Sequence, residues 1–344
     1  DDPQVIFESI NSTGLELSNA DLIRNFLLMN ADDQEKLYEN YWLYIEKTLR
    51  NKTDYSNLDA FFMQYIVYRT SKPVNNRQLY NSFVKLFKDS GYSQESILME
   101  LRYYAEIFGA FVYGSDKYSA QINKLLYRLR VLNQTTCYPF LFHVFDDYHQ
   151  GIITEETVEK ILQFILAYLL RRMVCGVPSN TLRGLFTYLY NRIFKVSSNK
   201  QKYYETLNKF LFTVSSKDVI PSAAEFERAL QKTNIYGNNA LCRFLLLDIE
   251  NGDGKEILQA ENLTIEHIMP QTLSADWNYI RPEDHEEYLH TLGNLTVTGY
   301  NSELSNKGFA EKRDIIRENS KAVVLNCDVL DKNSWGVTDI QARA

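Results

Sequence analysis

The sequence predicts a mainly α-helical protein, with a multi-helix body and a small β-containing unit near its C-terminal end. Apolar residues repeat at helical spacing from about residue 18 to about residue 250. Tyr (24) and Phe (19) are plentiful whereas Gly (14) and Pro (7) are scarce, which favours long helices over turn-rich β architecture. The pattern changes at the loop-like stretch NGDGKE, 251–256, and the two short stretches beyond it have β-type composition.

The helical body contains two clear helix-start signals. Ser18 precedes Asp21 by three residues, and Ser222 precedes Glu225 in the same way, a spacing typical of capping boxes. The clearest helix covers 154–174, where apolar residues keep the i, i+3, i+4 period. Further helices are expected near 33–49, 58–70, 76–89, 94–113, 117–132, 179–194, 200–213 and after Asn239.

The composition limits the class of protein. Hydrophobic residues make up 45% of the chain, enough for a sizeable core, and the formal charge of −7 argues against a generally basic nucleic-acid-binding surface. A local basic groove is still compatible with that charge. The four cysteines show no CxxC spacing, so we expect reduced thiols in a cytoplasmic protein. The longest apolar run, 161–170, is too short for a bilayer, and no membrane association is expected.

The C-terminal unit concentrates the residues suited to chemistry. LTIEHI and GNLTVT are predicted strands and FAEKRDIIREN is a predicted helix, which makes a β-loop-β-α unit. Glu266 and His267 end the first strand, and Asn294 begins the second. The residues expected on the turn into the last helix are Asn301, Asn306 and Lys307. A carboxylate and amide oxygens are ligands that Mg²⁺ prefers, and a histidine can take a proton from water, so this set suits metal-assisted phosphodiester hydrolysis.

Three blocks of sequence resemble one family. EHIMPQ…LGNLTVTGYNSELSNKGFAEKR resembles the HNH (His-Me finger) motif of GmrSD-type modification-dependent restriction endonucleases. FESINSTGLELSNADLIRNFLL is similar to the closing segment of that family's ParB/Srx-like N-terminal domain, and LLRRMVCGVPSN to its intervening helical region. The resemblance implies a truncated N-terminal domain over 1–30, a helical body over 31–250 and an HNH domain over 251–344 that holds a ββα-metal unit.

The resemblance also implies roles for individual residues. His267 would be the general base and Glu266 a metal ligand, while Asn294 would fix the hairpin and orient the histidine. Asn301 would be the second ligand, with Asn306 as its competitor. The residues that would contact DNA phosphates are Lys307, Lys312 and Arg313. The implied activity is Mg²⁺- or Mn²⁺-dependent cleavage of double-stranded, base-modified phage DNA in a bacterial cytoplasm, with homodimerisation left open.

The chain departs from the family pattern in three ways. Glu266 stands where many HNH motifs have Asp, and the extra methylene moves the carboxylate. The zinc-binding cysteines that flank some HNH sites are absent, so apolar packing must hold the unit together. The DGQQR-type motif associated with nucleotide hydrolysis is also absent, so we expect a fragment that has lost nucleotide use.

Other interpretations accompany each of these expectations. The whole chain would instead be a non-enzymatic helical interaction or dimerisation module with an inactive HNH unit, which its negative charge favours. Asn294 would merely cap a turn after Gly293. The basic residues near 307–317 alternate with acidic ones, which is also typical of a solvated helix face. The abundant tyrosines are expected in the core and at helix interfaces, in preference to a base-stacking surface.

Two further groups of residues have competing explanations. His143, Asp146 and Asp147 in HVFDDYH would share a helical face and bind a metal, although an acidic surface turn before Gly151 is the simpler interpretation. The residues that end the 154–174 helix are Arg171 and Arg172. Favourable interaction with the helix C-terminus explains them, and a phosphate contact is the alternative.

Overall fold

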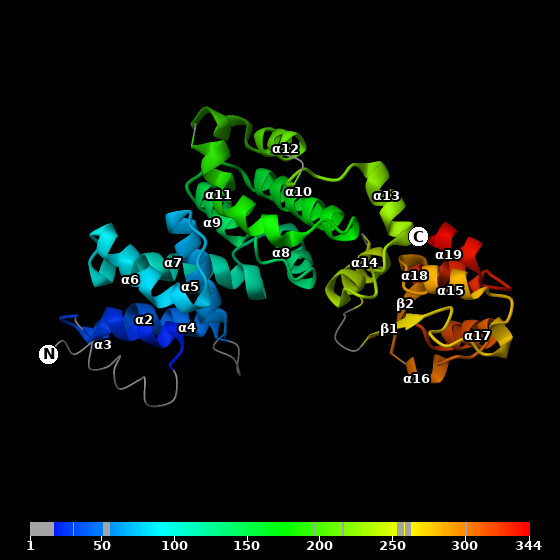
Figure 1. Cartoon of the computed structure of the whole chain (residues 1–344). Coiled ribbons are helices and arrows are strands. Elements are labelled where there is room, and N and C mark those ends of the chain that lie inside the picture. Colours follow the sequence, from blue (N-terminus) through cyan, green and yellow to red (C-terminus); the bar gives the residue numbers. More distant parts are fainter. Residues whose placement is uncertain are drawn as a thin grey trace. The chain divides into compact units, whose positions relative to one another are not determined.

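Helices make up most of the described chain, as the sequence predicts (Figure 1). The computed structural model describes residues 17–29, 31–50, 56–195, 197–214, 217–252, 258, 263–299 and 301–344. The strand and turn expected over 5–14 lie outside the described residues. Among the helices of the described ranges, none combines the length and the apolar character needed to cross a membrane.

The chain folds as two compact units. The helical unit comprises Asp1–Arg130, Gln134–Ile165 and Asn180–Val219, and the hairpin unit comprises Val131–Asn133, Leu166–Ser179 and Ile220–Ala344. The long segment of the hairpin unit therefore begins at Ile220, whereas the sequence predicts a domain start at residue 251.

Except for the helix Tyr138–His149, which no predicted range covers, the helices up to residue 219 follow the predicted ranges closely. They are α2 (Asn19–Leu28), α3 (Gln34–Leu37), α4 (Leu43–Leu49), α5 (Ser56–Thr70), α6 (Leu79–Ser90), α7 (Gln94–Tyr113), α8 (Ala120–Val131), α9 (Tyr138–His149), α10 (Glu155–Val174), α11 (Leu182–Phe194) and α12 (Tyr203–Thr213). A π-helical segment, Tyr38–Trp42, joins α3 to α4, and short 3₁₀ segments cover Asn76–Gln78, Ser179–Thr181 and Ser197–Lys202.

Both predicted capping boxes are present. The Ser18 hydroxyl accepts from the backbone N–H of Asp21 at 3.1 Å, and the Ser222 hydroxyl accepts from Glu225 at 3.3 Å. In each case the acidic side chain binds back to the serine. Local spacing is enough to fix these helix starts because all the partners lie within one turn.

Aromatic side chains fill the core of the helical unit, as expected from the composition. Tyr65, Tyr104 and Tyr138 are at least 95% buried. Phe108 packs edge-on against Tyr138 with 5.9 Å between ring centroids. The abundant aromatic residues thus contribute to packing between helices, where their large apolar area stabilises the fold.

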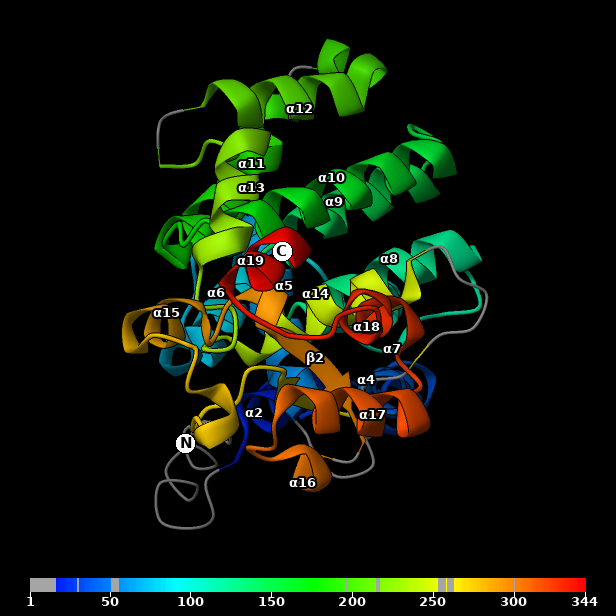
Figure 2. The same ribbon diagram turned by 90° about the vertical axis from the view of Figure 1, so that its right-hand side faces the viewer.

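The hairpin unit contains the two strands. They are β1 (Thr264–His267) and β2 (Leu295–Thr298), which pair antiparallel with His267 opposite Leu295. The helices of this part are α13 (Ala223–Lys232), α14 (Asn239–Asn251), α15 (Pro282–Tyr288), α16 (Asn301–Leu304), α17 (Phe309–Asn319), α18 (Val323–Leu330) and α19 (Val337–Arg343), with 3₁₀ turns at Ala275–Trp277 and Leu292–Asn294. Figure 2 shows α17 lying beside the hairpin with α16 next to it.

An apolar cluster forms the core next to the hairpin. Its buried members are Ile268, Met269, Trp277, Ile280, Tyr288, Leu304, Phe309, Ile316, Val329, Trp335 and Ile340. Helix α19 approaches the turn before β2 so closely that a Cβ atom on Gly293 would lie 1.9 Å from the carbonyl oxygen of Ile340. Only glycine fits there, and the turn that begins β2 is therefore held tightly against the cluster.

Candidate active site

The end of β1 forms one wall of a cavity of about 440 Å³. The residues that line it are Glu266, His267, Pro270, Gln271, Thr272, Ser305 and Asn306. Glu266 and His267 come from the strand, whereas Ser305 and Asn306 follow α16. Three residues predicted for the site, Glu266, His267 and Asn306, therefore border the same space.

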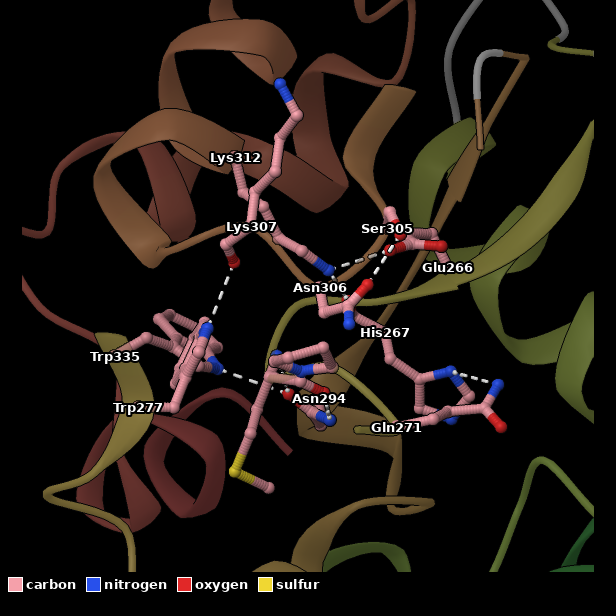
Figure 3. Close-up of polar contacts among 12 residues, drawn as sticks. Glu266, His267, Gln271, Trp277, Asn294, Ser305, Asn306, Lys307, Lys312 and Trp335 are labelled. Atoms are coloured by element: carbon pink, nitrogen blue, oxygen red, sulfur yellow. Dashed lines mark hydrogen bonds and ion pairs between the residues drawn. The ribbon is translucent and has the colours of Figure 1, made fainter. Parts of the chain in front are cut away.

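Glu266 forms a buried ion pair with Lys312 on α17 (Figure 3). The Lys312 ammonium donates to Glu266 Oε1 at 2.8 Å and to the His267 carbonyl oxygen at 2.8 Å. Burial raises the pKa of Glu266 and lowers the pKa of Lys312, and the attraction between the two opposes both shifts. The pair fixes α17 against the end of β1.

His267 is 3% exposed and contacts a side chain through each ring nitrogen. Its Nε2 lies 3.0 Å from His290 Nδ1, and its Nδ1 lies 3.4 Å from Gln271 Nε2. Burial, reinforced by electrostatic interaction with His290 and Lys312, lowers the pKa of His267 from 6.5 to about 3. The ring is therefore neutral near pH 7 and has a lone pair that can accept a proton.

Asn294 is fully buried and joins the two ends of the hairpin. Its Oδ1 accepts from the backbone N–H of Met269 at 2.8 Å, and its Nδ2 donates to the Met269 carbonyl oxygen at 3.0 Å. Nδ2 also donates to the carbonyl oxygen of Leu289 at 2.9 Å, and Trp335 Nε1 donates to Oδ1 at 3.3 Å. These bonds hold the chain two residues beyond His267, which is more than the capping of a local turn requires.

The two asparagines proposed as competing ligands differ in what the structure describes. Asn301 begins α16, and its side chain lies outside the described part of the chain. Asn306 borders the cavity, and its Oδ1 accepts from the Ser305 hydroxyl at 2.6 Å. An amide oxygen has a second lone pair, so this bond leaves Asn306 Oδ1 able to bind a cation.

The basic residues of this region lie in three different environments. Lys312 is 1% exposed. Both a phosphate contact and a solvated helix face would place its ammonium at the surface. That expectation is wrong because the ammonium pairs with Glu266 in the interior. Lys307 pairs with Glu311 one turn along, and its ammonium points away from Glu266 in Figure 3. Arg313 donates to the Lys332 carbonyl oxygen at 3.0 Å.

Of the alternative group in HVFDDYH, Asp147 lies in the interior of the helical unit, whereas His143 and Asp146 are half-buried. Asp147 is 2% exposed and accepts from Lys200 Nζ at 2.7 Å and Tyr190 OH at 2.8 Å. An acidic surface turn is therefore the wrong description of Asp147, because a lysine and a tyrosine satisfy its carboxylate in the core. His143 stacks on Tyr190 with 3.9 Å between ring centroids.

Arg171 and Arg172 bind backbone carbonyl groups near the end of α10. Arg171 Nη1 donates to the carbonyl oxygen of Pro221 at 3.2 Å, and Arg172 Nη2 donates to that of Pro178 at 3.1 Å. Arg172 is 1% exposed, so its guanidinium belongs to the structure of the hairpin unit.

Two residues that sequence reasoning missed contact the His267 ring. Gln271 and His290 lie against its two ring nitrogens. Gln271 is four residues from His267 and lies within the motif itself, so its proximity was available from the sequence. His290 is 23 residues away, and it contacts His267 because the folded chain brings the two residues together.

The oxygen donors at the cavity are of the type that a hard divalent cation prefers. Glu266 has a second carboxylate oxygen besides the one that binds Lys312, and Asn306 supplies an amide oxygen. In the described ranges no three His, Cys, Asp or Glu side chains gather as a metal-binding group. Phosphate and water oxygens would have to complete the coordination, which is usual for Mg²⁺ and compatible with Mn²⁺.

Comparison with known proteins places the cavity inside a recognised domain. Residues 220–344 match the family model described as the C-terminal domain of GmrSD restriction endonucleases. No curated protein matches the chain. The matched segment contains both strands, α16, α17 and the cavity, and it indicates a nuclease domain with DNA as its substrate. Residues 220–344 are thus similar to the C-terminal domain of GmrSD restriction endonucleases.

Proposed function

We propose that the hairpin unit is a metal-dependent DNA endonuclease of the HNH type, with the cavity at the end of β1 as its active site. The observation that carries the proposal is that Glu266, His267 and Asn306 line one cavity. A carboxylate, a neutral imidazole and an amide oxygen in one cavity can together support metal-assisted hydrolysis of a phosphodiester. The pair of strands followed by α17 corresponds to a ββα-metal unit.

Each side chain has a defined task in this proposal. Glu266 and Asn306 hold the metal, which when bound neutralises charge on the phosphate and on the departing 3′ oxygen. His267 accepts the proton of the attacking water, for which its neutral ring is prepared. The negative charge of the DNA phosphate raises the pKa of the nearby imidazole and so makes it a stronger base in the complex.

Asn294 has a supporting task. It binds both the N–H and the carbonyl oxygen of Met269, so it fixes the chain just beyond His267 without facing the cavity. A base must lie within hydrogen-bond reach of the water that it activates, and this bracing limits the movement of the histidine.

The family match supports a role in restriction, and we extend it to defence against phage DNA that carries modified bases. The wild-type chain should be incubated with supercoiled plasmid and with hydroxymethylcytosine-containing DNA, in Mg²⁺, in Mn²⁺ or in excess chelator. Cleavage that needs the metal and is faster on the modified DNA is the expected result. Cutting that persists in the chelator contradicts a metal-dependent site. A folded protein that cuts neither DNA would favour a helical interaction module.

A further inference from the structure

The helical unit contains a cavity of its own, with a volume of about 330 Å³. Residues of α5, α9 and α11 line it, and α9 packs against the other two helices (Figure 1). We propose that this cavity binds a small phosphate ester with an apolar body, such as a nucleoside monophosphate. The inference does not depend on the proposed nuclease activity, because every residue that it uses belongs to the helical unit.

The charge at the cavity favours an anion. Among the described residues that line it, Arg183 is the one charged side chain and none is acidic. Arg183 lies in the first turn of α11 and donates through one terminal nitrogen to the Val74 carbonyl oxygen. It forms no ion pair with any carboxylate of the described ranges. A guanidinium has five N–H donors in a planar fork, so most of them are left for the oxygens of a ligand.

Neutral hydrogen-bond donors border the same space. The side chains of Gln64 on α5 and Thr135 before α9 form no hydrogen bond with the described part of the chain. Asn76 accepts from Asn19 Nδ2 at 3.2 Å through its amide oxygen, which leaves its own NH₂ group able to donate. Together with Arg183 these donors exceed what the two oxygens of a carboxylate need, and they suit the three terminal oxygens of a phosphate ester.

A hydroxyl in the wall of the cavity lacks a partner. Thr136 borders the cavity, and its Oγ1 is buried without a hydrogen bond to any described residue. A buried polar group left in this way is unfavourable and uncommon in native proteins. Rotation about the Cα–Cβ bond moves the hydroxyl, so an oxygen of a bound ligand can supply the missing partner. Thr136 also lies just before α9, and the N-terminal end of a helix favours negative charge.

The rest of the wall is apolar, and this selects an ester over a bare anion. Met63 and Val67 from α5 and Pro139 from α9 contribute apolar side chains. A ring or sugar bound against them would remove apolar surface from water, whereas inorganic phosphate would not. Pockets that bind small molecules combine such an apolar lining with a few placed polar groups.

One carboxylate lies near this wall and is engaged elsewhere. Asp59 accepts from the backbone N–H of Ala20 at 2.8 Å and from Asn19 Nδ2 at 3.2 Å. These bonds hold the carboxylate at the start of α2, and Asp59 is not among the residues that line the cavity. Its negative charge therefore does not occupy the space beside Arg183.

Equilibrium dialysis of the whole chain with adenosine 5′-monophosphate tests the proposal. Adenosine, inorganic phosphate and a short DNA duplex serve as competitors, in excess chelator so that no DNA is cut. We expect saturable binding that adenosine does not displace. Inorganic phosphate should displace the ligand only at higher concentration, because it lacks the apolar body.

Two variants connect the binding to the cavity. Arg183→Gln should lower the affinity about tenfold or more, because a charge-assisted contact is lost. The matched control is Arg192→Gln on the same helix, whose guanidinium lies over the Tyr188 ring, and its affinity should stay within about twofold. Thr136→Val should weaken binding about threefold or more without lowering the unfolding free energy of the ligand-free protein, because valine keeps the shape and lacks the unpaired hydroxyl.

No saturable binding of adenosine 5′-monophosphate to the wild type overturns the proposal, as does an equal affinity in Arg183→Gln. If Arg183→Gln does not fold, Thr136→Val decides, and an affinity equal to that of the wild type then contradicts the site. Binding of the duplex that needs Arg183, with no binding of the monophosphate, would show a contact with a DNA backbone and overturn the small-molecule site.

Discussion

Asn294 binds both sides of the Met269 peptide, accepting from its N–H at 2.8 Å and donating to its carbonyl oxygen at 3.0 Å. This pair of bonds connects the start of β2 to the chain just beyond β1. Because Asn294 is fully buried, water cannot replace either bond. The end of β1, where His267 lies, thus has its position set from the opposite strand.

Replacement of Asn294 by alanine should cost at least about 3 kcal/mol of unfolding free energy, because several buried partners lose their hydrogen bonds and each costs about 1–3 kcal/mol. Denaturant unfolding measures the loss. The matched control is Asn319→Ala, since Asn319 is exposed at the end of α17 and its side chain donates to the Ile315 carbonyl oxygen within the same helix; its cost should stay below about 0.5 kcal/mol. Equal losses in the two variants would contradict a bracing role for Asn294.

The Glu266–Lys312 pair should behave as a coupled unit. Lys312→Met leaves the Glu266 carboxylate buried without its cation, and breaking a buried pair costs about 3–5 kcal/mol. The double variant Glu266→Gln/Lys312→Met should recover part of this loss, because no unpaired charge is left. A double-mutant cycle on unfolding free energies should give a coupling of about 0.5–3 kcal/mol. Strictly additive losses would show that the two side chains do not interact.

Metal dependence should identify the ligand among the asparagines. Asn306 borders the cavity, so Asn306→Ala should raise the Mg²⁺ concentration for half-maximal cleavage about tenfold or more. Ser305→Ala is the matched control, since it removes only the hydroxyl that donates to Asn306 and should have a smaller effect. If Asn301→Ala shifts the metal requirement and Asn306→Ala does not, the assignment of the ligand is wrong.

Acid should destabilise the helical unit through His143. Burial lowers the pKa of His143 from 6.5 to about 3, so below pH 6.5 the unfolded chain binds a proton that the folded chain does not. Stability is then lost as pH falls from about 6.5 towards 3, by up to about 1.4 kcal/mol per pH unit. His143→Phe retains a planar ring against Tyr190 and lacks the proton site, so its unfolding free energy should fall less between pH 7 and pH 5. Parallel curves for the two proteins would contradict the buried neutral histidine.

Local signals in the sequence predicted much of the fold. The capping boxes at Ser18 and Ser222 and the long helix α10 depend on neighbours within one or two turns, and all three are present. The range of helix α9 was not predicted, although HVFDDYH was considered as a helical face, because nearly all of its faces are buried and the polar stripe that reveals an amphipathic helix is lacking. Asp147 in this helix was expected at the surface because its partner in the core, Lys200, lies 53 residues further along the chain.

The candidate site was predictable where the motif is local. Glu266 and His267 are adjacent, and Asn306 follows in the same motif, so their shared cavity agrees with the expected convergence. The interior position of Lys312 was not predictable, because alternation with acidic residues gives the same pattern for a solvated face as for a helix with one inward lysine. His290 was missed because its contact with His267 depends on how distant segments pack.

The central claim is that His267 is the base of a nuclease site, and its most direct test is the initial rate of metal-dependent plasmid cleavage. Wild type, His267→Ala and His149→Ala should be purified identically and matched in folded concentration by their unfolding curves. Removal of the base should lower the rate at least about 10²-fold, whereas His149→Ala, in the helical unit, should cut like the wild type. Equal rates for His267→Ala and wild type would contradict the assignment of this cavity as the active site.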